Sequence, residues 1–380
     1  MSSREQMLAL GGGLSIIVGS DGTCPQSTEA VRANGPGSVR IFPTWRPGEG
    51  LSEEALGLGF RFGVIVRNRD PRPRRLQLTV DWQIPQPHPR RVFDFLYALV
   101  AGAADWQMIH GTWDFPVARF CLSLPPGDSW LGLNPRYNLA DLDAFITRLK
   151  QRRHHDLTIR VAGHSGQGRP IPILIIGDPG RSKHQALICA RAHPYESGGS
   201  YALEAMVDFL LGDAAATLRC RYAVHVLPML NPDGVYNGLS RLTDLRGANL
   251  NLVHTKMDPA HDSIQAVIKE VRPAIMIDLH QFLERDRDDV RSTDASFLAR
   301  LAQKLPDQSH VAKRWNLVKW ELGSIPEEQL NWSQHMAREY GGWGLLFELP
   351  WFGRTAHDMR TLGAALVQAV FATHTERTES

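Results

Sequence analysis

The first third of the chain alternates hydrophobic and polar residues with a period of two. The alternation is clearest over residues 60–67 and 76–82, and prolines and aspartates lie between these two stretches. A period of two is typical of half-buried strands, and proline and aspartate favour turns. A further strand is expected at residues 117–124, after which Pro-Pro-Gly-Asp ends the pattern. These features predict an antiparallel β-sandwich domain over residues 1–130.

From residue 131 to residue 380 the hydrophobic pattern changes to alternating helices and strands. This alternation is typical of an α/β domain with a mixed, mostly parallel sheet flanked by helices. The expected helices cover residues 139–149, 201–211, 263–271, 295–305 and 355–373, and the expected strands cover residues 158–162, 171–176, 185–191, 222–227, 274–277 and 344–346. Asn231-Pro-Asp-Gly predicts a turn.

Length and composition narrow the classes of function. A chain of 380 residues with 43% hydrophobic residues can build two cores. The 42 basic and 40 acidic residues give no reason to expect nucleic acid or a membrane surface as a partner. The four cysteines are far apart, which favours a reducing, cytoplasmic setting. No apolar run is long enough for a spanning helix. The oligomeric state is left open.

Candidate catalytic residues follow three of the expected strands. His193 and Glu196 come after the strand at 185–191, His280 comes after the strand at 274–277, and Glu348 follows the strand at 344–346. In an open α/β sheet, ligands bind beyond the carboxyl ends of the strands. Two imidazoles and a carboxylate can hold zinc and leave one position for water. We therefore expect one Zn²⁺ at His193, Glu196 and His280, although the H-x-x-E spacing alone often occurs by chance.

The zinc hypothesis assigns roles to two further residues. Glu348 can take a proton from the attacking water and return it to the leaving amine, and burial would raise its pKa. Arg241 is the candidate cation for the oxyanion of the tetrahedral intermediate. The plainer alternative for Glu348 is a carboxylate at a strand end that pairs with an arginine. The plainer alternative for Arg241 is a loop arginine exposed to water.

Five segments occur in an order that resembles the zinc metallocarboxypeptidases, most closely the bacterial members of the cytosolic carboxypeptidase branch. They are RAHPYES at 191–197, NPDGVYNG at 231–238 with Arg241, GANLN at 247–251, DLH at 278–280 and FEL at 347–349. The resemblance implies His193, Glu196 and His280 as zinc ligands, Arg241 as oxyanion stabiliser and Glu348 as general base. It also implies that Asn251 helps to hold the substrate's terminal carboxylate, and that a β-sandwich precedes the catalytic domain.

The chain departs from the family pattern around the substrate. Leu252 stands where the family has an arginine that pairs with the carboxylate, and a leucine has no charged donor. Arg246, at a neighbouring position, is the candidate replacement. Tyr195 replaces the usual glycine in the ligand loop and is assigned to substrate binding. Gln281 and the phenylalanine after it replace small or polar residues.

Three hypotheses follow from these residues. The first is a zinc metallocarboxypeptidase-like hydrolase that cleaves a peptide or amide bond near a C-terminus. The second is a zinc amide hydrolase or deacylase that acts on a small molecule or modified peptide without a free α-carboxylate, which Leu252 favours. The third is a catalytically inactive binding module with the β-sandwich as its working surface. The complete set of ligands and base argues against the third.

Overall fold

The computed structural model describes residues 5–43, 61–83, 92–244, 247–254, 258–282 and 285–379. The chain divides into two compact units. The first comprises Met1–Leu139 and Gly234–Arg246, and the second comprises Ala140–Asp233 and Gly247–Ser380.

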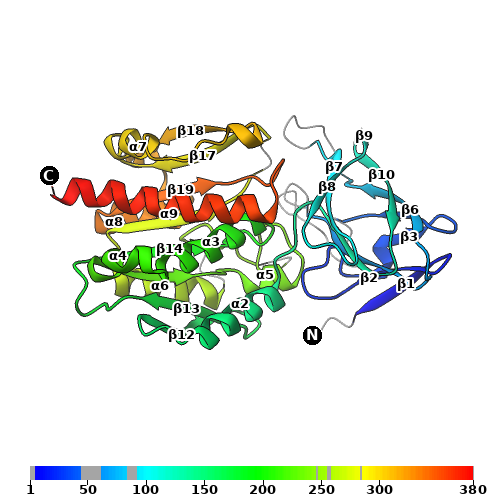
Figure 1. Cartoon of the computed structure of the whole chain (residues 1–380), viewed down its shortest axis with the longest axis horizontal. Coiled ribbons are helices and arrows are strands. Elements are labelled where there is room, and N and C mark those ends of the chain that lie inside the picture. The colour runs from blue at the N-terminus through cyan, green and yellow to red at the C-terminus, as the bar shows by residue number, and fades with distance from the viewer. Residues whose placement is uncertain are drawn as a thin grey trace. The chain divides into compact units, whose positions relative to one another are not determined.

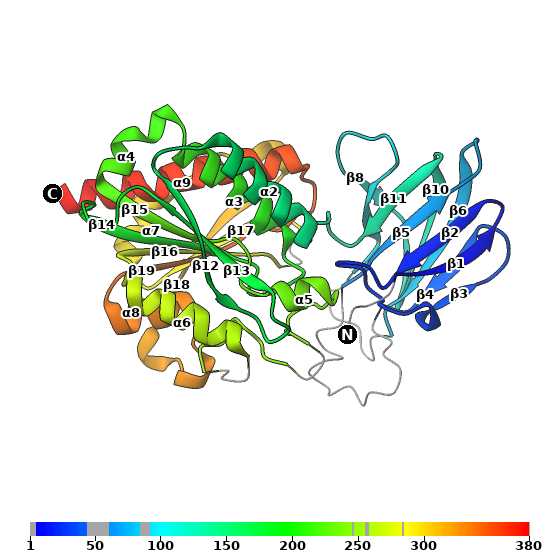
Figure 2. The same ribbon diagram turned by 90° about the horizontal axis from the view of Figure 1, so that it is seen from below.

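The first unit consists of two β-sheets that lie in separate layers, as Figure 2 shows. One sheet has the strand order β1-β2-β5-β11-β7-β8, and the other has the order β3-β4-β6-β10-β9. The strands are β1 Gln6–Gly11, β2 Leu14–Val18, β3 Val31–Ala33, β4 Ser38–Ile41, β5 Gly63–Asn68, β6 Arg74–Asp81, β7 Phe95–Leu99, β8 Gln107–His110, β9 Thr112–Asp114, β10 Val117–Leu124 and β11 Gly127–Gly132. All pairs of strands are antiparallel except β4 with β6.

The period-two pattern predicts three strands of this unit, β5, β6 and β10, and does not predict its other strands. Leu76, Leu78 and Val80 of β6 are buried, and the residues between them are more exposed, as expected for a strand with one face on a core. The expected strand at 117–124 is β10. Phe60 lies outside the described residues. Strand β11 crosses the predicted boundary at residue 130, because it pairs with both β5 and β7, and the first unit continues to Leu139.

The second unit is built on one eight-stranded sheet with the order β12-β13-β15-β14-β16-β19-β17-β18. Strands β15, β14, β16 and β19 are parallel neighbours, and so are β17 and β18. The strands are β12 Leu157–His164, β13 Pro170–Ile176, β14 His184–Ala190, β15 Tyr222–Leu227, β16 Ile275–His280, β17 Arg287–Ser292, β18 Arg314–Lys319 and β19 Trp343–Glu348. The helices are α2 Leu139–Arg152, α3 Ser197–Leu210, α4 Ala216–Arg221, α5 Pro232–Tyr236, α6 Pro259–Val271, α7 Ala295–Ala302, α8 Trp332–Tyr340 and α9 Ala356–Glu379.

Helices cover both faces of this sheet, with α3 and α9 on one face and α6 and α8 on the other (Figures 1 and 2). The face under α6 and α8 is a core of Ile, Leu, Val and Met side chains from the strands and these two helices. Local sequence fixes where the helices begin. The Asp258 side chain caps α6 and a proline opens its first turn, and Asn331 with Gln334 forms a capping box at α8. Among the described residues, no helix combines the length and hydrophobicity needed to cross a membrane.

Several element boundaries differ from the expectation. Strand β16 continues through Asp278 to His280, because it pairs with β14 as far as Leu279 and with β19 as far as His280. Asn231-Pro-Asp-Gly does not form a simple turn but leads into the short helix α5. Strands β17 and β18 and helix α8 were not expected from the hydrophobic pattern.

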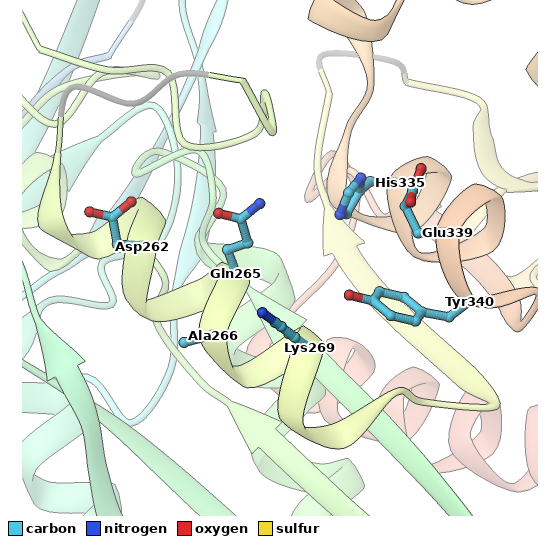
Figure 3. A pocket seen from close by; sticks show the side chains of 7 residues that line it. All are labelled: Asp262, Gln265, Ala266, Lys269, His335, Glu339 and Tyr340. Carbon is cyan, nitrogen blue, oxygen red and sulfur yellow. The ribbon is translucent and has the colours of Figure 1, made fainter.

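Helices α6 and α8 also enclose a hollow of about 410 Å³ on the second unit. Its lining residues are Asp262, Gln265, Ala266, Lys269, His335, Glu339 and Tyr340, as Figure 3 shows. This lining contains none of the residues to which the sequence assigns a catalytic, metal-binding or substrate-binding role.

Candidate metal centre

Three adjacent parallel strands deliver the predicted catalytic residues to one edge of the sheet. Strand β16 lies between β14 and β19 and is parallel to both, so the carboxyl ends of the three strands are neighbours. His280 is the last residue of β16 and lies opposite Glu348, the last residue of β19. His193 and Glu196 lie in the loop that joins β14 to α3. The expected arrangement at the strand ends is therefore present.

Buried hydrogen bonds hold the loop that carries His193 and Glu196. Arg191 has φ of +65° and is 1% exposed. Its Nε donates to the carbonyl oxygen of Pro194 at 3.1 Å, and its Nη1 donates to Ser200 Oγ at 3.1 Å. The backbone N–H of Asn231 donates to the carbonyl oxygen of Arg191, and its side-chain amide donates to that of Ala192. The loop therefore has a fixed path around the ligands.

Two imidazoles converge on one buried carboxylate. His193 Nδ1 lies 2.8 Å from Glu196 Oε1, and His280 Nδ1 lies 2.8 Å from Glu196 Oε2. The two imidazole rings are 5.0 Å apart between centroids. One ligand atom from each of the three residues lies within 4.8 Å of the other two, and all three residues are buried. Two neutral imidazoles and a carboxylate form a donor set that suits zinc.

The charges of this group are strongly coupled. Burial would raise the pKa of Glu196, but the neighbouring His193 and His280 hold it at about 2. Burial would lower the pKa of His280, but Asp278 and Glu196 raise it well above its usual value. The buried carboxylate therefore favours positive charge on the groups around it, and a divalent ion held between the three side chains would supply such a charge.

Asp278 is a functional candidate to which the sequence analysis assigned no role. Its Oδ1 lies 3.2 Å from His280 Nε2, on the side of the ring away from Glu196, and it also accepts the S–H of Cys189 at 3.3 Å. A carboxylate at the second ring nitrogen fixes the tautomer and orientation of a ligating histidine. The sequence contained a signal for this role. Asp278 and His280 are two residues apart in a strand, so their side chains point to the same face of the sheet.

Glu348 lies beside this group with a strongly shifted pKa. Burial and then the negative charge of Glu196 raise its pKa to about 8. The residue as a whole is only partly buried, but its Oε2 atom is enclosed and finds no hydrogen-bond partner in the described part of the chain. The charge of Arg291 acts to lower this pKa, but burial outweighs it.

Tyr195, assigned above to substrate binding, is 3% exposed. Its hydroxyl donates to the carbonyl oxygen of Gln281 at 2.6 Å, and the Gln281 side chain accepts the N–H of Gly198 at 3.1 Å. A Cβ at Gly198 would lie 3.0 Å from that Gln281 oxygen and 3.1 Å from a backbone oxygen, so a larger residue would disturb the contact. Tyr195 and Gln281 both depart from the family pattern. Their hydrogen bonds connect the loop that carries His193 and Glu196 to the end of β16.

The remaining predicted site residues are less closely defined. Asn251 is half-buried, and its N–H donates to the side chain of Asn249. Leu252 forms an isolated backbone bridge with Asn331. Arg241 is half-buried in the segment that groups with the first unit, and Arg246 lies outside the described residues. The roles of Arg241, Asn251 and Arg246 stay predictions.

Comparison with known proteins gives one consistent result. Residues 142–254 match the zinc carboxypeptidase family. The chain is 30% identical over 177 residues to cytosolic carboxypeptidase 6 of Caenorhabditis elegans, covering 42% of this chain and 36% of that protein. It is 31% identical over 155 residues to cytosolic carboxypeptidase-like protein 5 of Homo sapiens, covering 38% of this chain and 17% of that protein. It therefore spans about a third or less of the length of these relatives.

Similarity in structure extends over nearly the whole chain. The crystal structure of a metallo-carboxypeptidase from Burkholderia cenocepacia superposes with a TM-score of 0.78, covering 96% of this chain and 99% of that one. The sequence identity over this superposition is 19%, so the similarity establishes a common fold.

Proposed function

Because residues 142–254 match the zinc carboxypeptidase family, we propose that this protein is a zinc-dependent hydrolase that cleaves a peptide or amide bond near a C-terminus. One Zn²⁺ is assigned to His193, Glu196 and His280. The observation that supports this assignment is the convergence of three buried ligand atoms within 4.8 Å. When bound, zinc supplies Lewis-acid activation of a water and of the scissile carbonyl.

The protein's own residues orient the site and move the proton. Asp278 holds the His280 ring by its second nitrogen, so that Nδ1 faces Glu196. Glu348 lies opposite His280 in the strand ladder, so both side chains point to the same face of the sheet. From there the Glu348 carboxylate can accept a proton from the attacking water and deliver it to the leaving amine.

Substrate contacts are assigned by motif. Arg241 is the proposed oxyanion donor, and Asn251 and Arg246 are the proposed partners of a terminal carboxylate. Tyr195, predicted to contact the substrate, is buried and bonds to Gln281, so we propose that it holds the ligand loop instead. The proposed substrate is a peptide or amide, and no nucleic acid or membrane partner is proposed, given the even charge balance. A cytoplasmic location is supported by the names of the relatives, which are called cytosolic carboxypeptidases.

One observation favours a second candidate function. Leu252 stands where an arginine is expected, and an apolar side chain cannot neutralise a substrate carboxylate. The alternative is therefore an amide hydrolase or deacylase for a small molecule or modified peptide without a free α-carboxylate. A panel of peptides with free C-terminal carboxylates, tested against the matching C-terminal amides, separates the two functions.

The hydrolytic assignment is tested by Glu348→Gln with Glu328→Gln as control, because Glu328 is an exposed carboxylate. Zinc content is measured for both purified variants, and hydrolysis is followed on the peptide panel. We expect Glu348→Gln to keep its zinc and to lose about 10²- to 10⁴-fold in kcat, because the general base is missing. The control should match the wild type. Undiminished hydrolysis by Glu348→Gln would remove Glu348 from the mechanism.

A further inference from the structure

A row of polar side chains crosses four strands at the candidate site. His280 of β16 pairs with Glu348 of β19, Glu348 pairs with Asp289 of β17, and Asp289 pairs with Asn316 of β18. Residues that are paired across a ladder point to the same face of the sheet. Figure 1 shows β19, β17 and β18 in sequence along one side of the sheet. The row therefore extends the site beyond the proposed metal ligands and base.

Asp289 holds two arginines on this face. It is 1% exposed, its Oδ2 lies 2.8 Å from Arg291 Nη2, and its Oδ1 lies 3.4 Å from Arg287 Nε. The Asn316 side-chain amide donates to the same Oδ1 at 3.0 Å. Two guanidinium groups therefore share one carboxylate, and the three charged side chains carry a surplus positive charge.

Arg291 brings this positive charge to Glu348. It pairs with Leu346 across the ladder, so it is the diagonal neighbour of Glu348, and diagonal neighbours are within reach of long side chains. Its charge lowers the pKa of Glu348 against the larger effect of burial. The Arg291 side chain is 31% exposed. A group bound next to Glu348 can therefore contact this guanidinium.

The second arginine is held in a different way. Arg287 lies on the other side of Asp289 along β17, and its guanidinium carbon is 5.8 Å from the centre of the Phe282 ring. The Asn316 amide donates a hydrogen bond to Asp289, and Arg287 contacts the same carboxylate oxygen as an ion pair. Arg287 lies beyond the last pair of the β17–β19 ladder, whereas Arg291 lies within it, diagonal to Glu348. The geometry therefore favours Arg291 as the arginine that faces a group bound beside Glu348.

We propose that Arg291, aimed by Asp289, binds a carboxylate of the substrate and, together with the motif-assigned Arg246, takes the role that Leu252 cannot fill. The inference rests on the proposed hydrolytic function and names a specificity-determining residue for it. A guanidinium offers forked, charge-assisted donors that match a carboxylate, and Asp289 limits the orientations of this one. The carboxylate is either the terminal α-carboxylate or an acidic side chain of the last residue.

The test compares Arg291→Met with Arg314→Met in the zinc-loaded enzyme. Arg314 is a matched control, because it lies on neighbouring β18 with its side chain 75% exposed. Three substrates share one peptide sequence and differ only at the end: leucine with a free carboxylate, leucine amide and glutamate amide. Hydrolysis rates give KM and kcat for each, and zinc content and circular dichroism establish that the variants are folded.

We expect Arg291→Met to raise KM roughly 10- to 100-fold for a carboxylate substrate, because a charge-assisted contact is lost. Any change in kcat caused by the altered charge beside Glu348 should be shared by all three substrates. A rise in KM only for the free-acid leucine peptide identifies the α-carboxylate, and a rise only for glutamate amide identifies the side chain. Leucine amide should keep its KM, and Arg314→Met should match the wild type.

A second variant, Arg291→Lys, decides the question if Arg291→Met does not fold. It keeps the charge but loses the fork, so a smaller rise in KM is expected, restricted to the same carboxylate substrate. Unchanged KM for all three substrates in either folded variant would overturn the role of Arg291 while leaving the hydrolase intact. If the wild type with full zinc cleaves none of the three peptides, the proposed function itself fails.

Discussion

Arg354 and Asp288 form an ion pair whose side chains are both fully buried. Two parallel contacts join them, Nη1 to Oδ1 at 2.7 Å and Nη2 to Oδ2 at 2.5 Å. The guanidinium also donates to the carbonyl oxygen of Pro350 at 2.8 Å and to Gln308 Oε1 at 2.9 Å. The pair ties β17, which contains Asp288, to the segment that follows β19.

The free energy of unfolding that is lost when one partner of this ion pair is removed differs from the net contribution of the intact pair to stability. Burial raises the pKa of Asp288 even though Arg354 acts in the opposite direction, so desolvation outweighs the attraction. Asp288→Asn would leave a buried guanidinium without its counter-charge, which costs about 3–5 kcal/mol. In a unit of this size that loss corresponds to a fall in Tm of roughly 6–20 °C. The double variant Asp288→Leu/Arg354→Met removes both charges and should lose less than either single change.

The assay is thermal and urea unfolding of zinc-loaded protein, followed by circular dichroism. The matched control is the exposed pair of Arg160 and Glu270, whose side chains are 45% and 60% exposed. Arg160→Met should cost less than about 1 kcal/mol. The reasoning is refuted if Asp288→Asn unfolds at the wild-type temperature, or if the double variant is less stable than both single variants.

Three further predictions concern the site and its surroundings. Tyr195→Phe removes the hydroxyl that donates to Gln281, so we expect the free energy of unfolding in urea to fall by about 1 kcal/mol. Zinc should also be released faster to a chromophoric chelator. Unchanged release would contradict a role of Tyr195 in holding the ligand loop. Burial acts to raise the pKa of Asp294, but Arg377 and neighbouring donors lower it from 3.8 to about 2. Stability from the ionised group is therefore present above pH 3.8 and lost as the pH falls to about 2, and Asp294→Asn should flatten urea-derived stability over that window. Chelation of the metal should lower Tm and added zinc should restore it, and a Tm that ignores both treatments would argue against a bound ion.

The candidate metal centre could be predicted because its strands are buried on both faces. Strands β14, β16 and β19 read as continuous hydrophobic runs, which marks a parallel sheet covered by helices. The polar residues that interrupt or end those runs, such as Asp278 and Glu348, then lie at the carboxyl edge. The strand ends, however, were misplaced, because pairing with a neighbour extends a strand into residues that look polar.

The polar part of the site could not be predicted from hydrophobic periodicity. The sequence of β17, Arg-Asp-Asp-Val-Arg-Ser, reads as a charged loop, and only its place beside β19 makes it a strand. The position of Asp289 opposite Glu348 depends on strand order, which local sequence does not encode. The grouping of residues 234–246 with the first unit likewise depends on tertiary contacts rather than on periodicity.

Strand β17 runs antiparallel to β19 and stands outside the group of parallel strands that carries the proposed ligands. The spacing of His280 and Glu348 is set by the pairing of β16 with β19, in which β17 takes no part. Selection can change substrate preference on this strand while the hydrolytic residues stay constant, and a laboratory effort to redirect specificity would begin its randomised library there.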